Sequence, residues 1–297
     1  MSDELFILAF DHRGSFKSKM FGISGRDATA DEQAALQDAK RLVYEGALKA
    51  VDDGLSPDLV GVLVDEEMGA DVARDAKQRG IKLAMPVESS GQPLFDFEYG
   101  DEFGDHIERF DPEFSKVLVR WNPDDAPEDN RIQGERLKRL GDWLRDKGRT
   151  YLFELLVPPT DQQLALVGSA ADYDSEARPY LTLQAIRQIL DAGVEPDIWK
   201  IEGLDRRRNC ELLSDLVRSG GRDDVIAVVL GRGADDAKVD HWLRMGSGVP
   251  GYAGFAIGRS IWWAGVEGYK DGKMSRAEAV DSISANYRRF VDVYQAG

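Results

Sequence analysis

The chain has 297 residues, of which 54 are acidic and 38 basic, and its formal net charge is −16 at pH 7. This charge argues against nonspecific binding to nucleic acid or to anionic lipid, because both present negative groups that an acidic surface repels. The single cysteine, Cys210, excludes an intrachain disulfide framework and a multi-cysteine metal site. The three histidines, His12, His106 and His241, lie far apart and show no metal-binding spacing.

The N-terminal residues MSDELFILAFDHR lack the basic and apolar regions of a signal peptide. No apolar run approaches the roughly 20 residues that a membrane span needs. We therefore expect a cytoplasmic protein with no membrane contact. The length suits one α/β barrel of about 250 residues with additions, so we expect a single domain over residues 1–297.

Eight short segments rich in apolar and β-branched residues follow one another, each separated from the next by enough chain for a helix. Near-continuous apolar runs are typical of parallel strands that are covered on both faces. The predicted strands are Leu5 to Phe10, Leu59 to Val64, Ile81 to Val87, Lys116 to Trp121, Tyr151 to Val157, Asp197 to Ile201, Val225 to Leu230 and Gly254 to Ile257.

The connecting segments carry apolar residues at a spacing close to 3.6, which predicts helices. The last of them starts with Ser-Arg-Ala-Glu from Ser275, a capping box. Residues 89–112 show no clear periodicity, and we expect an irregular insertion there, over the site or against a neighbouring subunit. The predicted helices are Asp31 to Asp53, Glu66 to Gln78, Arg131 to Lys147, Leu181 to Ala192, Cys210 to Arg218, Ala234 to Met245 and Ser275 to Tyr294.

Eightfold alternation of strand and helix predicts a (β/α)₈ TIM barrel. A doubly wound open sheet is the alternative, but no GxGxxG motif follows the first strand. Active sites of barrels lie at the C-terminal ends of the strands. Ionisable groups or Gly-Arg pairs stand at these ends: Asp11 to Arg13, Asp65 to Glu67, Glu88, Lys116 and Arg120, Glu154, Lys200, Gly231 to Gly233, and Gly258 to Ser260.

Lys200 is the most informative of these residues, because it lies in the middle of the apolar strand Asp-Ile-Trp-Lys-Ile-Glu-Gly. Alternation places Lys200 and Glu202 on one face of the strand and Trp199 on the other. Burial lowers the pKa of a lysine, and a neutral amine is the nucleophile that forms Schiff bases with carbonyl substrates. The alternative is a lysine that reaches solvent from the strand end or pairs with Glu202.

Glu154 is likewise a charge inside an apolar strand, and Lys116 begins the predicted fourth strand. We expect Lys116 to lower the pKa of Lys200 through repulsion between like charges. We expect the apolar strand around Glu154 to raise the pKa of its carboxyl toward the working pH, as proton transfer requires. The two Gly-Arg pairs predict a phosphate site, because the loops after strands 7 and 8 of barrels often bind phosphate.

The ordered set Ile-Leu-Ala-Phe-Asp11-His-Arg, Lys116-Val-Leu-Val, Phe-Glu154, Trp-Lys200-Ile-Glu-Gly and Ile-Gly258-Arg259 resembles class I aldolases of the tagatose-bisphosphate aldolase kind. The chain resembles more closely the 2-deoxy-5-keto-gluconate-6-phosphate aldolase-like domain, formerly a domain of unknown function. In some bacteria that domain is fused to a sugar kinase of inositol catabolism. The resemblance spans nearly the whole chain and implies a barrel that performs Schiff-base chemistry with no cofactor and no metal.

The resemblance also implies residue roles. Lys200 matches the Schiff-base lysine, and Glu154 matches the carboxylate that transfers protons as the imine forms. Lys116 matches a lysine that stabilises charge, and Asp11 matches an aspartate that orients substrate hydroxyls or assists C–C cleavage. The phosphate is expected to bind at Gly258 and Arg259, with Gly231 and Arg232 as the other half of the site.

Two positions depart from the family pattern. The third strand ends in Glu88, where fructose-bisphosphate aldolases of this class carry a lysine, and the seventh-strand loop reads Gly-Arg-Gly instead of presenting serine and glycine. We expect Arg13, Glu88 and Arg120 to contact substrate. Arg120 and the run Arg206 to Arg208 favour a substrate with a carboxylate, although the run is equally typical of an exposed helix start.

These observations predict a class I aldolase that cleaves a phosphorylated keto-sugar or keto-sugar acid. The expected substrate is 2-deoxy-5-keto-gluconate 6-phosphate, and the products are dihydroxyacetone phosphate and malonate semialdehyde. The resemblance implies a homo-oligomer. Two alternatives stay open: a barrel that binds phosphosugars without catalysis, and a metal-assisted lyase or isomerase with Asp65, Glu66, Glu67 and Glu88 as ligands.

Overall fold

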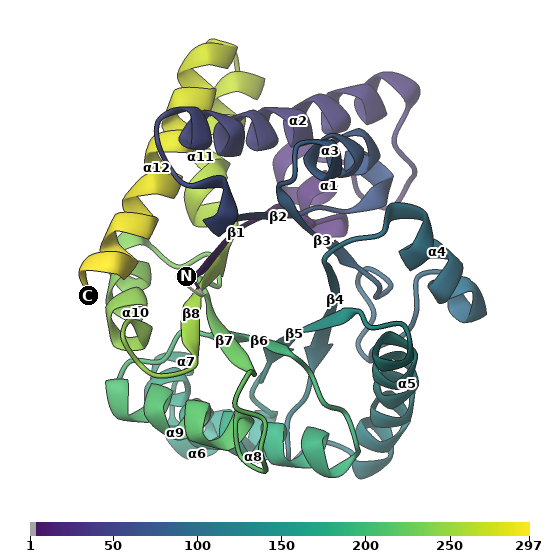
Figure 1. Ribbon diagram of the computed structural model, residues 1–297, viewed down its shortest axis with the longest axis vertical. Coiled ribbons are helices and arrows are strands. Elements are labelled where there is room, and N and C mark those ends of the chain that lie inside the picture. Colours follow the sequence, from purple (N-terminus) through teal and green to yellow (C-terminus); the bar gives the residue numbers. More distant parts are fainter. Residues whose placement is uncertain (1–3) are drawn as a thin grey trace.

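The computed structural model describes residues 4–297 and shows a closed barrel of eight parallel strands in sequence order (Figure 1). The predicted (β/α)₈ barrel is therefore confirmed, and the doubly wound sheet is excluded. The ends of each strand lie within two residues of the predicted ends. The strands are β1 (Leu5–Ala9), β2 (Val60–Leu63), β3 (Lys82–Pro86), β4 (Phe114–Arg120), β5 (Thr150–Leu156), β6 (Ile198–Glu202), β7 (Ile226–Leu230) and β8 (Tyr252–Ile257).

Helices surround the barrel, and all seven that the sequence predicts are present. They are α2 (Ala30–Asp52), α3 (Glu66–Gln78), α5 (Pro127–Asp146), α8 (Arg178–Asp191), α9 (Arg207–Val217), α10 (Asp236–Gly246) and α12 (Arg276–Ala296), the last with the predicted capping box at Ser275. The sequence did not predict α1 (Gly14–Phe21), α4 (Phe103–Phe110), α6 (Asp161–Val167), α7 (Ala170–Asp172), α11 (Arg259–Lys270), the 3₁₀ turns η1 (Pro57–Leu59) and η2 (Gly100–Glu102), or the π-helical turn η3 (Tyr173–Ala177).

The predicted irregular insertion over residues 89–112 is irregular only in its first half. Its second half contains η2 and α4, which is the helix between β3 and β4. Phe103, Ile107 and Phe110 recur on one face of α4 and are buried. Two turns of helix carry too few repeats of this pattern to distinguish it from the aromatic residues of a loop.

The strands alternate between an apolar barrel interior and an outer face that packs on the helices. Ile7, Leu152 and Val228 belong to the cluster inside the barrel, whereas Trp199 and Ile201 pack in the layer between strands and helices. Toward the C-terminal ends, the inward positions change from apolar to ionisable. The register of β5 and β6 places Glu154 directly opposite Lys200.

The C-terminal helices hold the first strand in place. The helix α12 packs along α2 and α11, and Figure 1 shows these three helices beside β1. The Tyr287 hydroxyl of α12 donates a hydrogen bond to the carbonyl oxygen of Phe6 over 2.5 Å. The Trp262 Nε1–H of α11 donates to the carbonyl oxygen of Ala9 over 2.9 Å. The end of β1, where Asp11 follows, is thus fixed from the outside.

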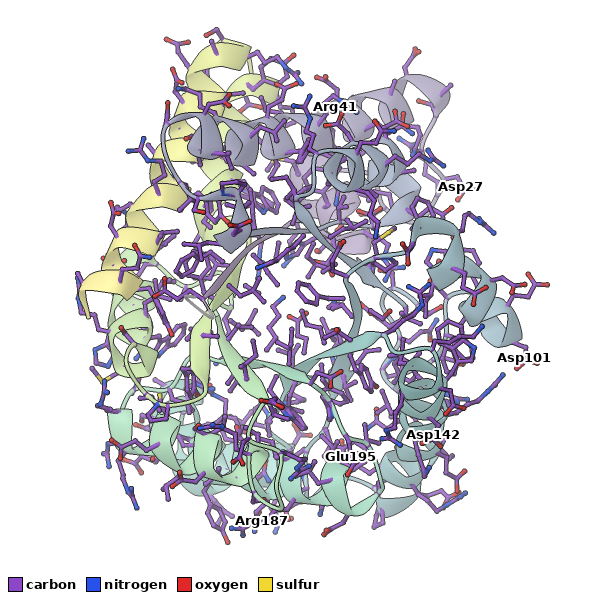
Figure 2. All side chains as sticks on the ribbon, viewed as in Figure 1. Asp27, Arg41, Asp101, Asp142, Arg187 and Glu195 are labelled. Carbon is purple, nitrogen blue, oxygen red and sulfur yellow. The ribbon has the colours of Figure 1, made fainter. Side chains whose placement is uncertain are left out.

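Charged side chains cover the outer face of the helices. Asp101 and Arg187 project away from the barrel in Figure 2. Across residues 4–297 no helix combines the length and the apolar character that crossing a membrane requires.

Candidate active site

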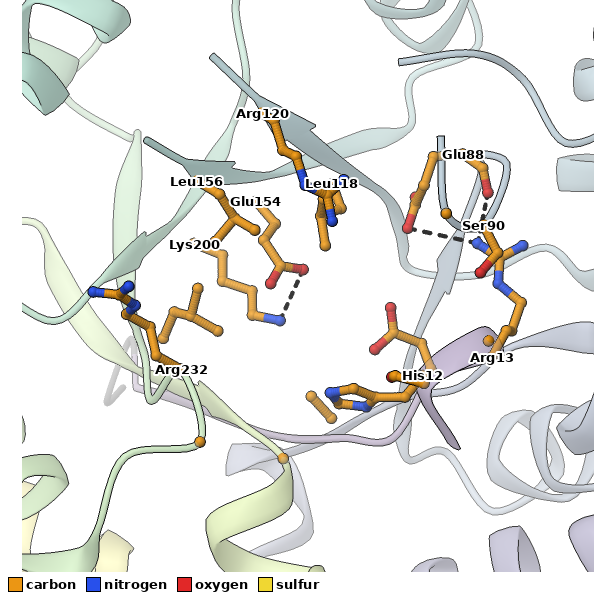
Figure 3. Close-up of a pocket in the computed structure, with 18 of the residues that line it drawn as sticks. His12, Arg13, Glu88, Ser90, Leu118, Arg120, Glu154, Leu156, Lys200 and Arg232 are labelled. Carbon is orange, nitrogen blue, oxygen red and sulfur yellow. Dashed lines mark hydrogen bonds and ion pairs between the residues drawn. The ribbon is translucent and has the colours of Figure 1, made fainter. Parts of the chain in front are cut away.

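A cavity of about 750 Å³ opens at the C-terminal ends of the strands, and side chains that follow or end most of the strands line it (Figure 3). It brings together all eleven residues that the sequence and the family resemblance place in the site. They are Asp11, Arg13, Glu88, Lys116, Arg120, Glu154, Lys200, Gly231, Arg232, Gly258 and Arg259.

Two lysines share one carboxylate at the floor of this cavity. Glu154 Oε2 lies 3.0 Å from Lys200 Nζ and 3.0 Å from Lys116 Nζ. All three side chains are buried, with 2% of Lys200, 5% of Glu154 and 1% of Lys116 exposed. Figure 3 shows Lys200 and Glu154 pointing toward one another in the centre of the cavity. The alternative partner of Lys200, Glu202, instead accepts the Val157 backbone N–H and pairs with Arg232.

Lys116 is bound on three sides. Its Nζ donates hydrogen bonds to Asp11 Oδ2 and to Glu88 Oε1, each over 2.8 Å, in addition to its contact with Glu154. Burial acts to lower the pKa of Lys116, but the three carboxylates outweigh it and raise that pKa well above its ordinary value. Lys116 therefore stays charged across the physiological range.

The same cations set the charge of the carboxyls around them. Burial acts to raise the pKa of Asp11, but Lys116 and Lys200 hold it well below its ordinary range. Burial likewise acts to raise the pKa of Glu154, and the same two lysines lower it overall. The prediction that the apolar strand raises the pKa of Glu154 is therefore wrong, because it took account of the strand and not of two ammonium groups at 3.0 Å.

Glu88 and Arg13 form the β1–β3 side of the cavity. The Arg13 guanidinium donates to the Glu88 carbonyl oxygen over 2.6 Å and pairs with Glu98 at 3.2 Å. Burial raises the pKa of Glu88 despite the nearby cations Lys116 and Arg13. Glu88 Oε2 is buried with no hydrogen-bond partner in the described part of the chain. Glu88 thus holds a proton more readily than an ordinary glutamate does.

The loops after β7 and β8 meet at the β7–β8 side of the cavity. Arg232 and Gly233 have positive φ angles of 53° and 72°, and a Cβ added to Gly258 would lie 2.4 Å from the Ala9 carbonyl oxygen. The Arg232 guanidinium pairs with Glu202 and Asp174 at 2.9 Å and 2.6 Å, so it is already occupied by carboxylates. Arg259 donates to the Arg232 carbonyl oxygen and pairs with no carboxylate of residues 4–297.

The cavity is positively charged although the chain is acidic. Seven lysine and arginine residues line it, against four aspartate and glutamate residues, which leaves a formal charge of +3. Each of the four carboxylates is already paired with a cation. Lys19, Arg120 and Arg259 pair with no carboxylate in the described residues. These three cations suit an anionic ligand, and the walls of a cleft concentrate their field.

The sequence did not identify three residues that belong to the site. His12 lines the cavity, and burial lowers its pKa to about 4, so that it is neutral at pH 7. Glu202 pairs with Arg232. Glu202 lies on the same face of β6 as Lys200, and the alternation of the strand residues could have identified it for that reason. Asp174 comes from η3, in the long connection between β5 and β6, and no motif marks it.

The carboxylates of the metal-assisted alternative do not come together. Asp65 pairs with Lys40, Glu67 with Lys17, and Glu66 with His106 and Arg109, whereas Glu88 alone of the four lines the cavity. No group of three or more His, Cys, Asp and Glu among residues 4–297 is arranged to hold a metal ion.

The arginines at 206 to 208 lie on the surface at the start of α9, away from the cavity. Arg207 donates a hydrogen bond to the Ser247 carbonyl oxygen, and Arg208 pairs with Glu211. The exposed helix start, rather than contact with ligand, is the interpretation that the structure supports.

Comparison with solved structures shows the same fold in two other proteins. The crystal structure of Cgl0159 from Corynebacterium glutamicum is 18% identical with a TM-score of 0.57, over 97% of this chain and 86% of that chain. An archaeal fructose 1,6-bisphosphate aldolase is 14% identical with a TM-score of 0.58, over 99% of this chain and 95% of that chain. No curated protein sequence matches the chain. One family model matches residues 1–297, and the chain belongs to that family, described as "Uncharacterized protein conserved in bacteria (DUF2090)".

Proposed function

We propose that this protein is a class I aldolase that binds its carbonyl substrate as a Schiff base on Lys200. The observation that carries the proposal is a lysine with 2% exposure on the floor of a cationic cavity, with one carboxylate, Glu154, within 3.0 Å. Lys116 is the other candidate nucleophile, but three carboxylates hold its proton. The chain has the same fold as an archaeal fructose 1,6-bisphosphate aldolase, and this likeness supports the proposal.

The imine forms through a proton relay between Lys200 and Glu154. The ammonium of Lys200 gives one proton to Glu154, and the neutral amine attacks the substrate ketone to form a carbinolamine. Glu154 returns the proton to the departing oxygen, which leaves as water with a second hydrogen from the nitrogen, and the nitrogen keeps one hydrogen as the iminium. Lys116, 3.0 Å from Glu154, stabilises the carboxylate form at the start and the end of this relay.

Cleavage then uses the iminium as an electron sink. Asp11, ionised because of its lowered pKa, takes the proton of the substrate hydroxyl two carbons from the iminium carbon. The C–C bond breaks, the new carbonyl leaves as an aldehyde, and the bonding electrons form an enamine. The enamine carbon takes the proton back, and water hydrolyses the iminium to release the ketone product and Lys200.

The substrate class follows from the cavity cations that pair with no carboxylate among residues 4–297. Arg259 and the glycine-rich loops after β7 and β8 suit a phosphate, and Arg120 at the end of β4 suits a second anion. In a closed eight-stranded barrel, β4 and β8 lie opposite each other. We therefore assign a phosphorylated keto-sugar acid, with 2-deoxy-5-keto-gluconate 6-phosphate as the best candidate. Its cleavage yields dihydroxyacetone phosphate and malonate semialdehyde.

A turnover assay tests this proposal. The enzyme is incubated with 2-deoxy-5-keto-gluconate 6-phosphate, with and without EDTA, and dihydroxyacetone phosphate is measured by coupled reduction. We expect release of dihydroxyacetone phosphate that EDTA does not change. Activity that EDTA abolishes and Mg²⁺ restores would favour a metal-assisted lyase, and binding of the phosphosugar without cleavage would favour a non-catalytic phosphosugar-binding protein.

Replacement of Arg120 tests the assignment of the second anion. Arg120→Gln removes a charge-assisted hydrogen bond, worth about 1.5–3 kcal/mol, so KM for the keto-sugar acid phosphate should rise roughly 10- to 100-fold. Binding of dihydroxyacetone phosphate, which lacks the acid end, should change little. Arg131→Gln on the exposed face of α5 is the matched control and should change neither value. Equal losses for both ligands would place Arg120 at the phosphate instead.

A further inference from the structure

A buried ion pair lies directly behind the end of β1, outside the cavity. Lys40 Nζ of α2 is 2.7 Å from Asp65 Oδ2, and the two side chains are 1% and 0% exposed. Neither residue lines the cavity. Burial of two charges costs free energy that their attraction repays only partly, so the fold alone gives little reason for this pair.

Lys40 uses all three of its ammonium hydrogens. Besides Asp65, it donates to the carbonyl oxygen of Phe10 and, over 2.9 Å, to that of His12. These two carbonyl groups belong to the residues on either side of Asp11. The ammonium also lies over the Phe16 ring, 4.8 Å from its centroid. Three hydrogen bonds and this ring contact therefore fix the cation.

The backbone that Lys40 holds is a link between two elements. β1 ends at Ala9 and α1 begins at Gly14, so residues 10–13 belong to neither element. The Phe10 N–H donates to the Leu63 carbonyl oxygen of β2 over 2.8 Å, and the Arg13 carbonyl oxygen accepts the Lys17 N–H of α1 over 3.0 Å. The carbonyl oxygens of Phe10 and His12 are the groups of this link that Lys40 holds. Asp65 is itself anchored, because its other carboxylate oxygen accepts the Met68 backbone N–H over 2.9 Å and caps α3. A rigid chain of contacts thus runs from the start of α3 through Lys40 to the residues that flank Asp11.

We infer that Lys40, held by Asp65, is a positioning residue that aims the Asp11 carboxylate at Lys116 and at the substrate hydroxyl. The effect of this positioning on catalysis rests on the proposed function. Lys40 and Asp65 touch neither Lys200 nor Glu154 in the described structure. Loss of the pair should therefore affect the step that needs Asp11, which is C–C cleavage, and spare formation of the imine.

The test replaces both charges together. Lys40→Met with Asp65→Asn fills nearly the same space, keeps an oxygen to cap α3 and leaves no unpaired buried charge. The control is the exposed pair on the same helix, Lys49→Met with Asp53→Asn, whose side chains lie 3.0 Å apart. Circular dichroism and thermal unfolding establish that both variants are folded.

We expect the buried-pair variant to lower kcat for cleavage by about 10- to 100-fold, as for a misplaced catalytic group, with KM within about threefold of wild type. Borohydride trapping of dihydroxyacetone phosphate on Lys200 should be unchanged. In an Asp11→Asn background, the same change should lower kcat by less than about threefold, because Asp11 no longer contributes. An additive loss, or an equal loss of trapping, would overturn the inference.

A readout that needs no reaction separates this inference from the proposed function. Carbon-13 NMR titration of the Asp11 carboxyl should show a pKa well below its ordinary value in wild type and a higher pKa in the buried-pair variant, as the carboxylate moves from Lys116. An unchanged titration would show that Lys40 does not position Asp11. Absence of any imine in wild type would overturn the proposed function alone.

Discussion

Replacement of Lys200 by methionine should abolish the activity and leave the fold intact. Methionine fills the space of the lysine stem but has no amine, so kcat should fall by at least about 10⁴-fold, as for other lost nucleophiles. Glu154 keeps its contact with Lys116 at 3.0 Å, so no buried charge loses its last partner. The free energy of unfolding should therefore change by no more than about 1 kcal/mol.

The measurements are turnover with 2-deoxy-5-keto-gluconate 6-phosphate and denaturant unfolding. Lys82→Met is a matched control, because Lys82 also lies on a strand, at the opposite end of the barrel and outside the cavity. It should retain wild-type turnover. Retention of turnover by Lys200→Met would show that Lys200 is not the nucleophile, whereas loss of folding would show that the lysine is a structural charge.

Replacement of Lys116 by methionine should destabilise the protein more than any other single change in the site. Asp11, Glu88 and Glu154 lie 2.8, 2.8 and 3.0 Å from Lys116 Nζ, and all lie buried or nearly so. Glu154 keeps Lys200 at 3.0 Å and Glu88 keeps Arg13 at 3.7 Å. Asp11 loses the cation it pairs with in the described residues, and uncompensated buried charge costs about 3–5 kcal/mol. Activity should fall as well, because Asp11 loses the group that holds it ionised.

The destabilisation should depend on pH. In wild type, the lowered pKa of Asp11 and of Glu154 stabilises the fold above their ordinary pKa values of 3.8 and 4.5, and this contribution is lost as pH falls. In Lys116→Met, both pKa values should rise above those of wild type, because burial is then opposed by Lys200 alone. The difference from wild type should therefore be largest at pH 7 and shrink toward pH 5.

Urea unfolding at pH 5, 6 and 7 measures this dependence. The control is Lys138→Met, which removes one lysine from an exposed pair with Asp142 and should cost at most about 1 kcal/mol at every pH. A loss for Lys116→Met that stays the same across this range would show that its carboxylate partners are not the cause.

The sequence predicted the barrel well because its strands are buried on both faces and leave a continuous apolar signal. The exceptions to that signal, Glu154 and Lys200, marked the site for the same reason: a charge inside an apolar strand needs a partner. The family resemblance added Lys116, at the start of the predicted fourth strand. Alternation placed Lys200 and Trp199 on opposite faces of the strand, and the structure has Lys200 in the cavity and Trp199 in the layer between strands and helices.

The pairings among those charges depend on three-dimensional contacts and were not predictable from spacing. Glu154 lies opposite Lys200 through the register of β5 and β6, and Lys116 reaches it from β4, which together reverse the expected direction of the Glu154 pKa shift. Asp174, from the π-helical turn η3, occupies Arg232. The sequence contains one indication of the role of Lys40: the residue lies among the buried apolar residues of α2.

Borohydride reduction in the presence of dihydroxyacetone phosphate, followed by peptide mass mapping, tests the central claim most directly. The experiment reports on imine formation alone and needs no knowledge of the aldehyde half of the substrate. A stable adduct on Lys200, absent from Lys200→Met and from the cavity lysines Lys19 and Lys116, is the predicted result. Binding of dihydroxyacetone phosphate without an adduct on any lysine would contradict Schiff-base catalysis by this barrel.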